Sequence, residues 1–130
     1  MPTPHGFSSV NSYIFVNDAG DYIDFLIRAF DAKELGRTIH DGRIANARLQ
    51  LGESTVMVSE ASERFSPTYS FFYLYVDDAD AVFAQAIRAG AVPMMEPADM
   101  PYGDRQGMVK DPAGNVWGPS TRFDDDQFNA

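Results

Sequence analysis

Residues 13–30, YIFVNDAGDYIDFLIRAF, return in altered form 60 positions later as residues 73–90, YLYVDDADAVFAQAIRAG. Both stretches place Tyr, Val, Asp and Ala at matching positions and carry the run Ile-Arg-Ala just before their last residue. A repeat with a fixed period dictates architecture, and two copies are too few for a solenoid. The repeat therefore predicts two similar modules packed together, with any binding cleft at their junction.

Each copy begins with a strand and continues as a helix. Residues 8–16 alternate between apolar and polar positions as a strand does, and residues 69–76 form an aromatic-rich counterpart. Asp18 and Asp78 stand where a side-chain oxygen can cap a helix. The apolar residues that follow each aspartate form a single stripe at helical spacing, which predicts helices that end near Phe30 and before Gly90.

Three shorter strands follow each helix. In the first copy we expect strands over 33–40, 43–51 and 55–59, with a hairpin turn at Asp41-Gly42. In the second copy we expect an edge strand over 92–96, because prolines interrupt it, and strands over 105–110 and 115–121. A type I turn at 111–114 joins the last two. The chain thus shows βαβββ twice and is predicted to be an α+β protein.

The predicted organisation is a single domain. Residues 1–7 form a leader, residues 8–122 form the domain, and residues 123–130 form an acidic tail. Within the domain, module one spans 8–60, a polar linker spans 61–68 and module two spans 69–122. Sixty residues alone would bury too little surface, so the two modules are expected to fold together.

Composition narrows the function classes. A net charge of −9 argues against nucleic acid as a partner and favours cationic ligands. The absence of cysteine excludes disulfides, thiolate metal sites and cysteine nucleophiles. No apolar run is long enough to cross a bilayer, and no secretion signal is visible, so we expect a cytoplasmic protein without a membrane partner. Exposed strand edges favour a homodimer.

The chain resembles the vicinal oxygen chelate superfamily, which includes glyoxalase I, extradiol dioxygenases and the fosfomycin and bleomycin resistance proteins. The resemblance covers roughly residues 8–122. Its most specific part is Tyr102-Gly103-Asp104-Arg105, Gly107 and the run 111–117, DPAGNVW. Residues 16–19, VNDA, followed by Ala29-Phe30, are similar to the PhnB-type branch of glyoxalase/bleomycin resistance proteins.

The resemblance implies a divalent metal in members that are enzymes, held by His, Gln or Glu from the first and last strands of each module. The corresponding positions here are Asn11, Met57, Phe71 and Gly118. These residues are poor ligands for a hard cation. The two histidines, His5 in the leader and His40 beside a turn, are expected at the surface. We therefore expect no metal and no cofactor, and the sequence does not decide whether any chemistry is catalysed.

Strand alternation predicts what lines the cleft instead. The predicted ligand-binding residues are Asn11, Tyr13, Phe15, Met57, Phe71, Tyr73, Tyr75, Tyr102 and Arg105. Such an aromatic lining suits a flat, partly apolar or cationic small molecule. The leading hypothesis is a glyoxalase/bleomycin resistance-like protein that binds and sequesters such a compound without a metal. The alternatives are a metal-dependent lyase, isomerase or dioxygenase-like enzyme, and an interaction module with an abandoned cleft.

Three residues near the second module's end leave alternatives open. Tyr102 lies on a loop and is either a lid residue or a surface aromatic. Arg105 with Asp104 either orients an anionic ligand or forms a structural ion pair. Trp117 is either a packing anchor between the last strand and a helix, which we expect, or a ligand contact.

Overall fold

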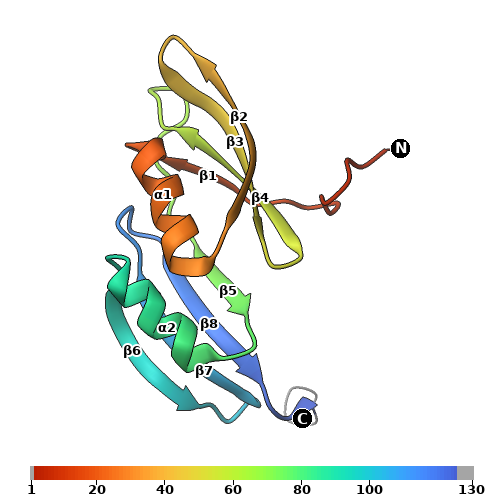
Figure 1. Cartoon of the computed structure of the whole chain (residues 1–130), viewed down its shortest axis with the longest axis vertical. Helices are drawn as coiled ribbons and strands as arrows, with labels where there is room; N and C mark the ends of the chain where they lie inside the picture. The colour runs from red at the N-terminus through yellow and green to blue at the C-terminus, as the bar shows by residue number, and fades with distance from the viewer. Residues whose placement is uncertain (1, 126–130) are drawn as a thin grey trace. The chain divides into compact units, whose positions relative to one another are not determined.

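The computed structural model describes residues 2–125, and the chain divides into two compact units. Unit 1 is Met1–Thr68 and unit 2 is Tyr69–Ala130. Each unit contains one helix and a four-stranded sheet, and Figure 1 shows the helix of each unit lying across one face of its sheet.

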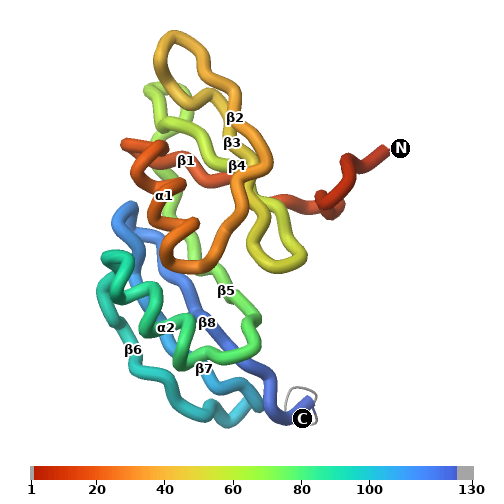
Figure 2. Tube along the Cα trace, in the orientation of Figure 1, coloured from red at the N-terminus to blue at the C-terminus, as the bar shows by residue number. Residues whose placement is uncertain are grey.

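Unit 1 follows the order strand, helix, strand, strand, strand. Its elements are β1 (Tyr13–Val16), α1 (Ala19–Phe30), β2 (Lys33–His40), β3 (Arg43–Leu51) and β4 (Ser54–Glu60). The sheet order is β1-β4-β3-β2, with β1 parallel to β4 and the other neighbours antiparallel. The tube in Figure 2 lets the reader follow this path through unit 1 and its repetition in unit 2.

Unit 2 has the same topology. Its elements are β5 (Phe71–Tyr75), α2 (Ala79–Arg88), β6 (Val92–Asp99), β7 (Asp104–Lys110) and β8 (Val116–Arg122). The sheet order is β5-β8-β7-β6, with β5 parallel to β8. The repeated βαβββ pattern and the α+β class are confirmed. The edge position of β6 is also confirmed, although the strand runs past Pro97 to Asp99.

The core of each unit lies between its helix and one face of its sheet. In unit 1, Ile14, Leu49 and Val58 are almost completely buried on that face. The helix contributes the predicted apolar stripe, of which Ile23 and Leu26 are fully buried. Side chains alternate along a strand, so the neighbouring positions point to the face away from the helix.

Two turns form as predicted. Asp41 and Gly42 both have positive φ values, 52° and 73°, as the two central residues of a type I′ hairpin turn require. The N–H of Gly114 donates a 3.0 Å hydrogen bond to the carbonyl of Asp111, which closes the second turn. Trp117 is 2 % exposed, packs against Phe72 and is confirmed as a buried packing residue.

The start of unit 1 differs from the prediction. The first strand begins at Tyr13, not at Ser8, and Asn11 lies in a local turn in which its side chain bonds to both backbone groups of Ser8. The expected side-chain cap at Asp18 is wrong, because this residue is left-handed (φ 58°) and its side chain makes no capping bond. Asp78 does cap α2, through a 3.1 Å bond from the N–H of Ala81.

The predicted linker is part of unit 1. The N–H of Ala61 donates to the carbonyl of Val16 (2.7 Å), and the N–H of Thr68 donates to the carbonyl of Phe15 (3.0 Å). These bonds hold the segment to β1. At the end of unit 2, the N–H groups of Phe123 and Asp124 donate to the carbonyl of Gly103, and residues 126–130 of the predicted acidic tail lie outside the described residues.

Candidate functional site

The sheet of each unit leaves one face uncovered by its helix, and most of the predicted binding residues lie there. We call these the unit 1 face and the unit 2 face. On the unit 1 face, Tyr13 of β1 pairs in register with Met57 of β4, and Phe15 pairs with Ser59. Tyr13 is 37 % exposed, while Phe15 and Met57 are half-buried.

A column of stacked rings crosses the unit 1 face. The ring centroids of Tyr13 and Phe15 are 4.7 Å apart, and those of Phe15 and Phe65 are 5.0 Å apart. The ring planes are within 15° of parallel in both pairs, and the guanidinium of Arg64 lies 5.3 Å from the Phe65 centroid. Phe65 comes from the predicted polar linker, and the sequence interpretation missed it. We call Tyr13, Phe15 and Phe65 the aromatic column.

The column is held at its base by hydrogen bonds. The Tyr13 hydroxyl lies 2.6 Å from Oγ of Ser59, and that Oγ donates a 2.7 Å bond to the carbonyl of Ala45. Because Ser59 has one proton and gives it to Ala45, the Tyr13 hydroxyl is the donor toward Ser59. The ring of Tyr13 therefore has a fixed orientation on the sheet.

The unit 2 face carries three aromatic side chains at alternate positions of β5. Phe71, Tyr73 and Tyr75 are 53 %, 44 % and 52 % exposed. The rings of Tyr73 and Tyr75 lie 5.2 Å apart. Phe71 is close to Gly118 of β8, where a Cβ would stand 3.2 Å from the Phe71 ring. The small residue thus lets an aromatic ring lie across the neighbouring strand.

A completely buried carboxylate lies beneath the two tyrosines. Asp104, at the start of β7, accepts hydrogen bonds at Oδ2 from the phenols of Tyr73 and Tyr75, the latter at 2.9 Å. Its Oδ1 accepts no hydrogen bond from the described residues but lies 3.1 Å from Nη1 of Arg122. Burial, and secondly the hydrogen bond to Asp104, raise the pKa of both phenols. Both tyrosines are therefore held as neutral donors to this carboxylate.

Tyr102 reaches the unit 2 face from the loop before β7. Its hydroxyl donates to Oε1 of Gln106, and Gln106 is itself buried. The backbone carbonyl of Tyr102 accepts a 2.7 Å bond from Arg122, the partner of Asp104. The loop is therefore fastened to the same polar cluster that supports Tyr73.

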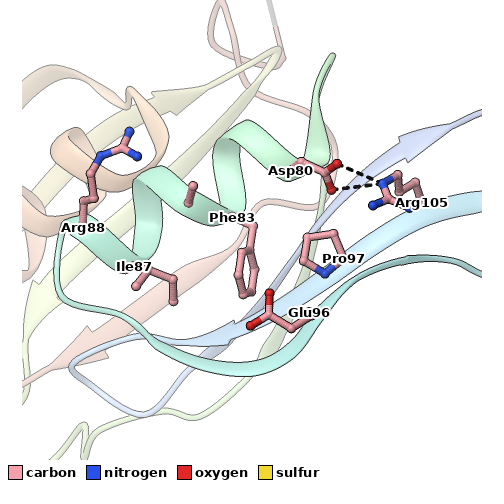
Figure 3. Close-up of a pocket in the computed structure, with 8 residues that line it drawn as sticks. Asp80, Phe83, Ile87, Arg88, Glu96, Pro97 and Arg105 are labelled. Atoms are coloured by element: carbon pink, nitrogen blue, oxygen red, sulfur yellow. Dashed lines mark hydrogen bonds and ion pairs between the residues drawn. The ribbon is translucent and has the colours of Figure 1, made fainter.

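Arg105 does not join this set. It forms ion pairs with Asp80 (3.0 Å) and Asp99 (3.2 Å), so the expected pairing of Arg105 with Asp104 is wrong. The alternation along β7 sends Asp104 to the unit 2 face and Arg105 to the helix side. There Arg105 lines a groove of about 550 Å³ between α2 and β6 (Figure 3), whose floor includes Phe83 and Pro97.

The positions that correspond to the family's metal ligands do not fit a divalent cation. Asn11 has its amide engaged with the backbone of Ser8, and Phe71, Met57 and Gly118 offer no oxygen or nitrogen side-chain ligand. Within residues 2–125 no group of three His, Asp or Glu side chains is arranged to hold a metal ion. His5 and His40 are exposed, as expected.

Asp104 and Phe65 were not predicted to support or extend the aromatic rings. Asp104 lay inside the motif that carries the family resemblance, but nothing in its neighbours indicated that it would be buried below Tyr73 and Tyr75. The strand alternation that places Met57 on the unit 1 face places Ser59 there as well. Phe65 had a weak signal, as the single aromatic of an otherwise polar segment.

Comparison with solved structures gives the same fold. TioX from Micromonospora sp. ML1 is 27% identical, with a TM-score of 0.74 that covers 88% of this chain and all of that one. TnmS3 from Streptomyces sp. CB03234, described as an antibiotic binding protein, superposes with a TM-score of 0.69 at 22% identity over 88% of this chain and 97% of its own. At that identity the likeness concerns the fold alone.

Comparison of sequences gives the family. The uncharacterized protein Rv0887c of Mycobacterium tuberculosis is 36% identical over 121 residues, which is 84% of this chain and 71% of that protein. Neither helix within residues 2–125 is long and apolar enough to cross a membrane. The PhnB-type branch stays a prediction. The model of the Glyoxalase/Bleomycin resistance protein/Dioxygenase superfamily matches residues 6–118, and the chain belongs to this superfamily.

Proposed function

We propose that this protein binds aromatic or cationic small molecules on the aromatic faces of its sheets, and sequesters them without a metal or other cofactor. The observation that carries the proposal is the row of Phe71, Tyr73 and Tyr75. These rings are about half exposed, yet the two phenols are fixed from below by a buried carboxylate. Rigid aromatic surface with fixed polar groups is typical of ligand sites.

The excess of acidic residues in unit 2 supports a cationic group in the ligand. Residues 69–130 contain ten acidic and four basic residues. The phenols of Tyr73 and Tyr75 both donate hydrogen bonds to Asp104, so their oxygens remain available as acceptors. Ring faces beside such oxygens attract an ammonium group. TnmS3, a protein of the same fold, is described as an antibiotic binding protein, which is consistent with a small-molecule ligand.

The proposal extends to assembly and location. We expect a homodimer, because β5 and β6 are edge strands of the unit 2 sheet and exposed edges favour pairing. We expect the protein in the cytoplasm, bound to neither nucleic acid nor membrane. Light scattering of the purified protein tests the dimer.

A thermal-shift screen tests the binding function. Purified protein is heated with aromatic and cationic compounds, bleomycin included, and a ligand at about 100 times its Kd adds about 2.7 kcal/mol to the free energy of unfolding. Phe71→Ala and Tyr75→Ala should reduce the shift. Phe123→Ala, which removes an equally exposed ring outside these faces, should not.

Metal analysis tests the other half of the proposal. The same protein is assayed for bound divalent ions by elemental analysis, and the binding screen is repeated after dialysis against a chelator. Unchanged binding is expected. One tightly held divalent ion per chain, or binding that disappears with the chelator, would favour the metal-dependent enzyme instead.

A further inference from the structure

Arg48 occupies the middle of a row that crosses the whole unit 1 sheet. The register pairs Tyr13 with Met57, Met57 with Arg48, and Arg48 with Gly36. Ala47, which precedes Arg48, is completely buried on the helix side. Arg48 therefore projects onto the unit 1 face, the same face as the aromatic column.

Gly36 makes room for the guanidinium. A Cβ on Gly36 would stand 2.5 Å from Nη2 of Arg48 and 3.5 Å from its Cζ. Gly36 does not have a positive φ, so its backbone conformation does not require glycine, and a Cβ here would instead force the guanidinium of Arg48 to move. The guanidinium of Arg48 therefore lies close to the backbone of β2 at Gly36, in a position it could not keep beside a larger residue.

A directed chain of hydrogen bonds holds Arg48. Its Nη1 donates to Oδ1 of Asn46 (2.8 Å), and Nδ2 of Asn46 donates to the hydroxyl of Tyr13 (3.2 Å). The Tyr13 hydroxyl donates a hydrogen bond to Oγ of Ser59, and Ser59 donates one to the carbonyl of Ala45. Arginine only donates, so the direction of every bond is fixed. One amide group thus separates the guanidinium from the aromatic column.

The charge of Arg48 is not neutralised within the described chain. Among residues 2–125, no carboxylate forms an ion pair with it, whereas Arg37, Arg105 and Arg122 all have acidic partners. The side chain is half-buried in a protein of net charge −9. A guanidinium carries five N–H donors in a planar fork that matches a carboxylate in two parallel bonds.

From these observations we infer that Arg48 is the anchor for a carboxylate group on the bound molecule, whose ring system lies against the aromatic column. The ligand class is an aromatic carboxylate. This inference rests on the proposed function, because it names a chemical group of the aromatic ligand that the unit 1 face would bind. It goes beyond that function, because the negative charge of the protein and the unit 2 face favour a cationic ligand and predict no anionic group.

Three probes of one shape test the inference by isothermal titration. They are naphthoate, the neutral naphthamide and the cationic naphthylmethylamine. Naphthoate should bind the native protein more tightly than naphthamide, and Arg48→Gln should weaken naphthoate binding about tenfold or more while naphthamide is unaffected. Arg48→Lys should restore part of the affinity. Gly36→Ala should weaken naphthoate binding as well, because its Cβ displaces the fork.

Arg37→Gln is the matched control. It removes the same charge from the helix side of the same sheet, where Arg37 is bound to Glu34, and should leave naphthoate binding as it was. Circular dichroism confirms that each variant folds. If naphthamide or the amine binds as tightly as naphthoate, or if Arg48→Gln has no effect, Arg48 is not the anchor, although the proposed function stands. If none of the three probes binds, the inference and the aromatic-site proposal both fall.

Discussion

The phenol of Tyr75 donates a 2.9 Å hydrogen bond to Oδ2 of Asp104, a carboxylate that is completely buried. Tyr73, two residues earlier on β5, donates to the same oxygen. The two exposed rings thus share one anchor at the start of β7. A ligand that lies on these rings meets the charge of Asp104 only through the phenol oxygens, because Asp104 itself has no exposed surface.

Alkaline titration should show this anchoring directly. Burial, followed by the hydrogen bond to Asp104, raises the pKa of both Tyr73 and Tyr75 above the ordinary tyrosine value of about 10. A raised folded pKa contributes stability that is complete below about pH 10 and is lost as pH rises further. Absorbance of phenolate against pH should therefore show two tyrosines that ionise late. Two late groups that persist in Tyr73→Phe would contradict this assignment.

Asp104→Asn should weaken the hydrogen bonds of both phenols and lower the unfolding free energy. The variant removes the acceptor charge and leaves Arg122 without its buried partner, for which a loss of about 3 kcal/mol in unfolding free energy is expected. The late tyrosine ionisation should move to lower pH. Asp99→Asn is the control, because Asp99 is exposed and, among residues 2–125, pairs only with Arg105 at the surface, so its loss should cost less than about 1 kcal/mol in urea unfolding.

Glu60 should prove to be the residue that caps α1. Its two carboxylate oxygens accept 2.9 Å bonds from the N–H groups of Asp18 and Ala19. Glu60→Ala leaves these groups without that acceptor and removes a negative charge from the positive end of the helix, which should lower the unfolding free energy by about 1 kcal/mol. Glu53→Ala, in the exposed turn before β4, should change it far less. Equal effects of the two substitutions in chemical denaturation would show that Glu60 does not act as a cap.

The elements were predictable because their signals are local. The stripe of α1 repeats at helical spacing, Asp41-Gly42 specifies a hairpin by itself, and prolines mark β6 as an edge. The repeat then fixes the topology of unit 2 once unit 1 is known. Each of these inferences uses residues that are neighbours in the chain.

The supports of the candidate site were not predictable for the opposite reason. Glu60 caps a helix that begins 41 residues earlier, and the local aspartate at position 18 was the more obvious candidate. Phe65 joins a stack with Phe15, which is 50 positions away in the chain. Asp104 contacts Tyr73 across the sheet. Polar and aromatic contacts of this kind depend on sheet register, which the sequence pattern does not specify.

Two glycine substitutions should change stability in opposite directions. A Cβ on Gly107 of β7 would stand 2.8 Å from the Phe83 ring and 3.2 Å from Pro97, so Gly107→Ala is expected to lower the unfolding free energy by about 1–3 kcal/mol. Gly20 lies in the first turn of α1, where a Cβ would be 3.9 Å from Ile44, so Gly20→Ala should stabilise by up to about 1 kcal/mol through helix propensity. Urea unfolding of both variants provides the measurement.

Gly107→Ala combined with Phe83→Leu should recover part of the loss, because the smaller side chain vacates the space that the new methyl group needs. If the double variant loses as much unfolding free energy as the two single variants added together, Phe83 is not the residue that requires glycine at position 107.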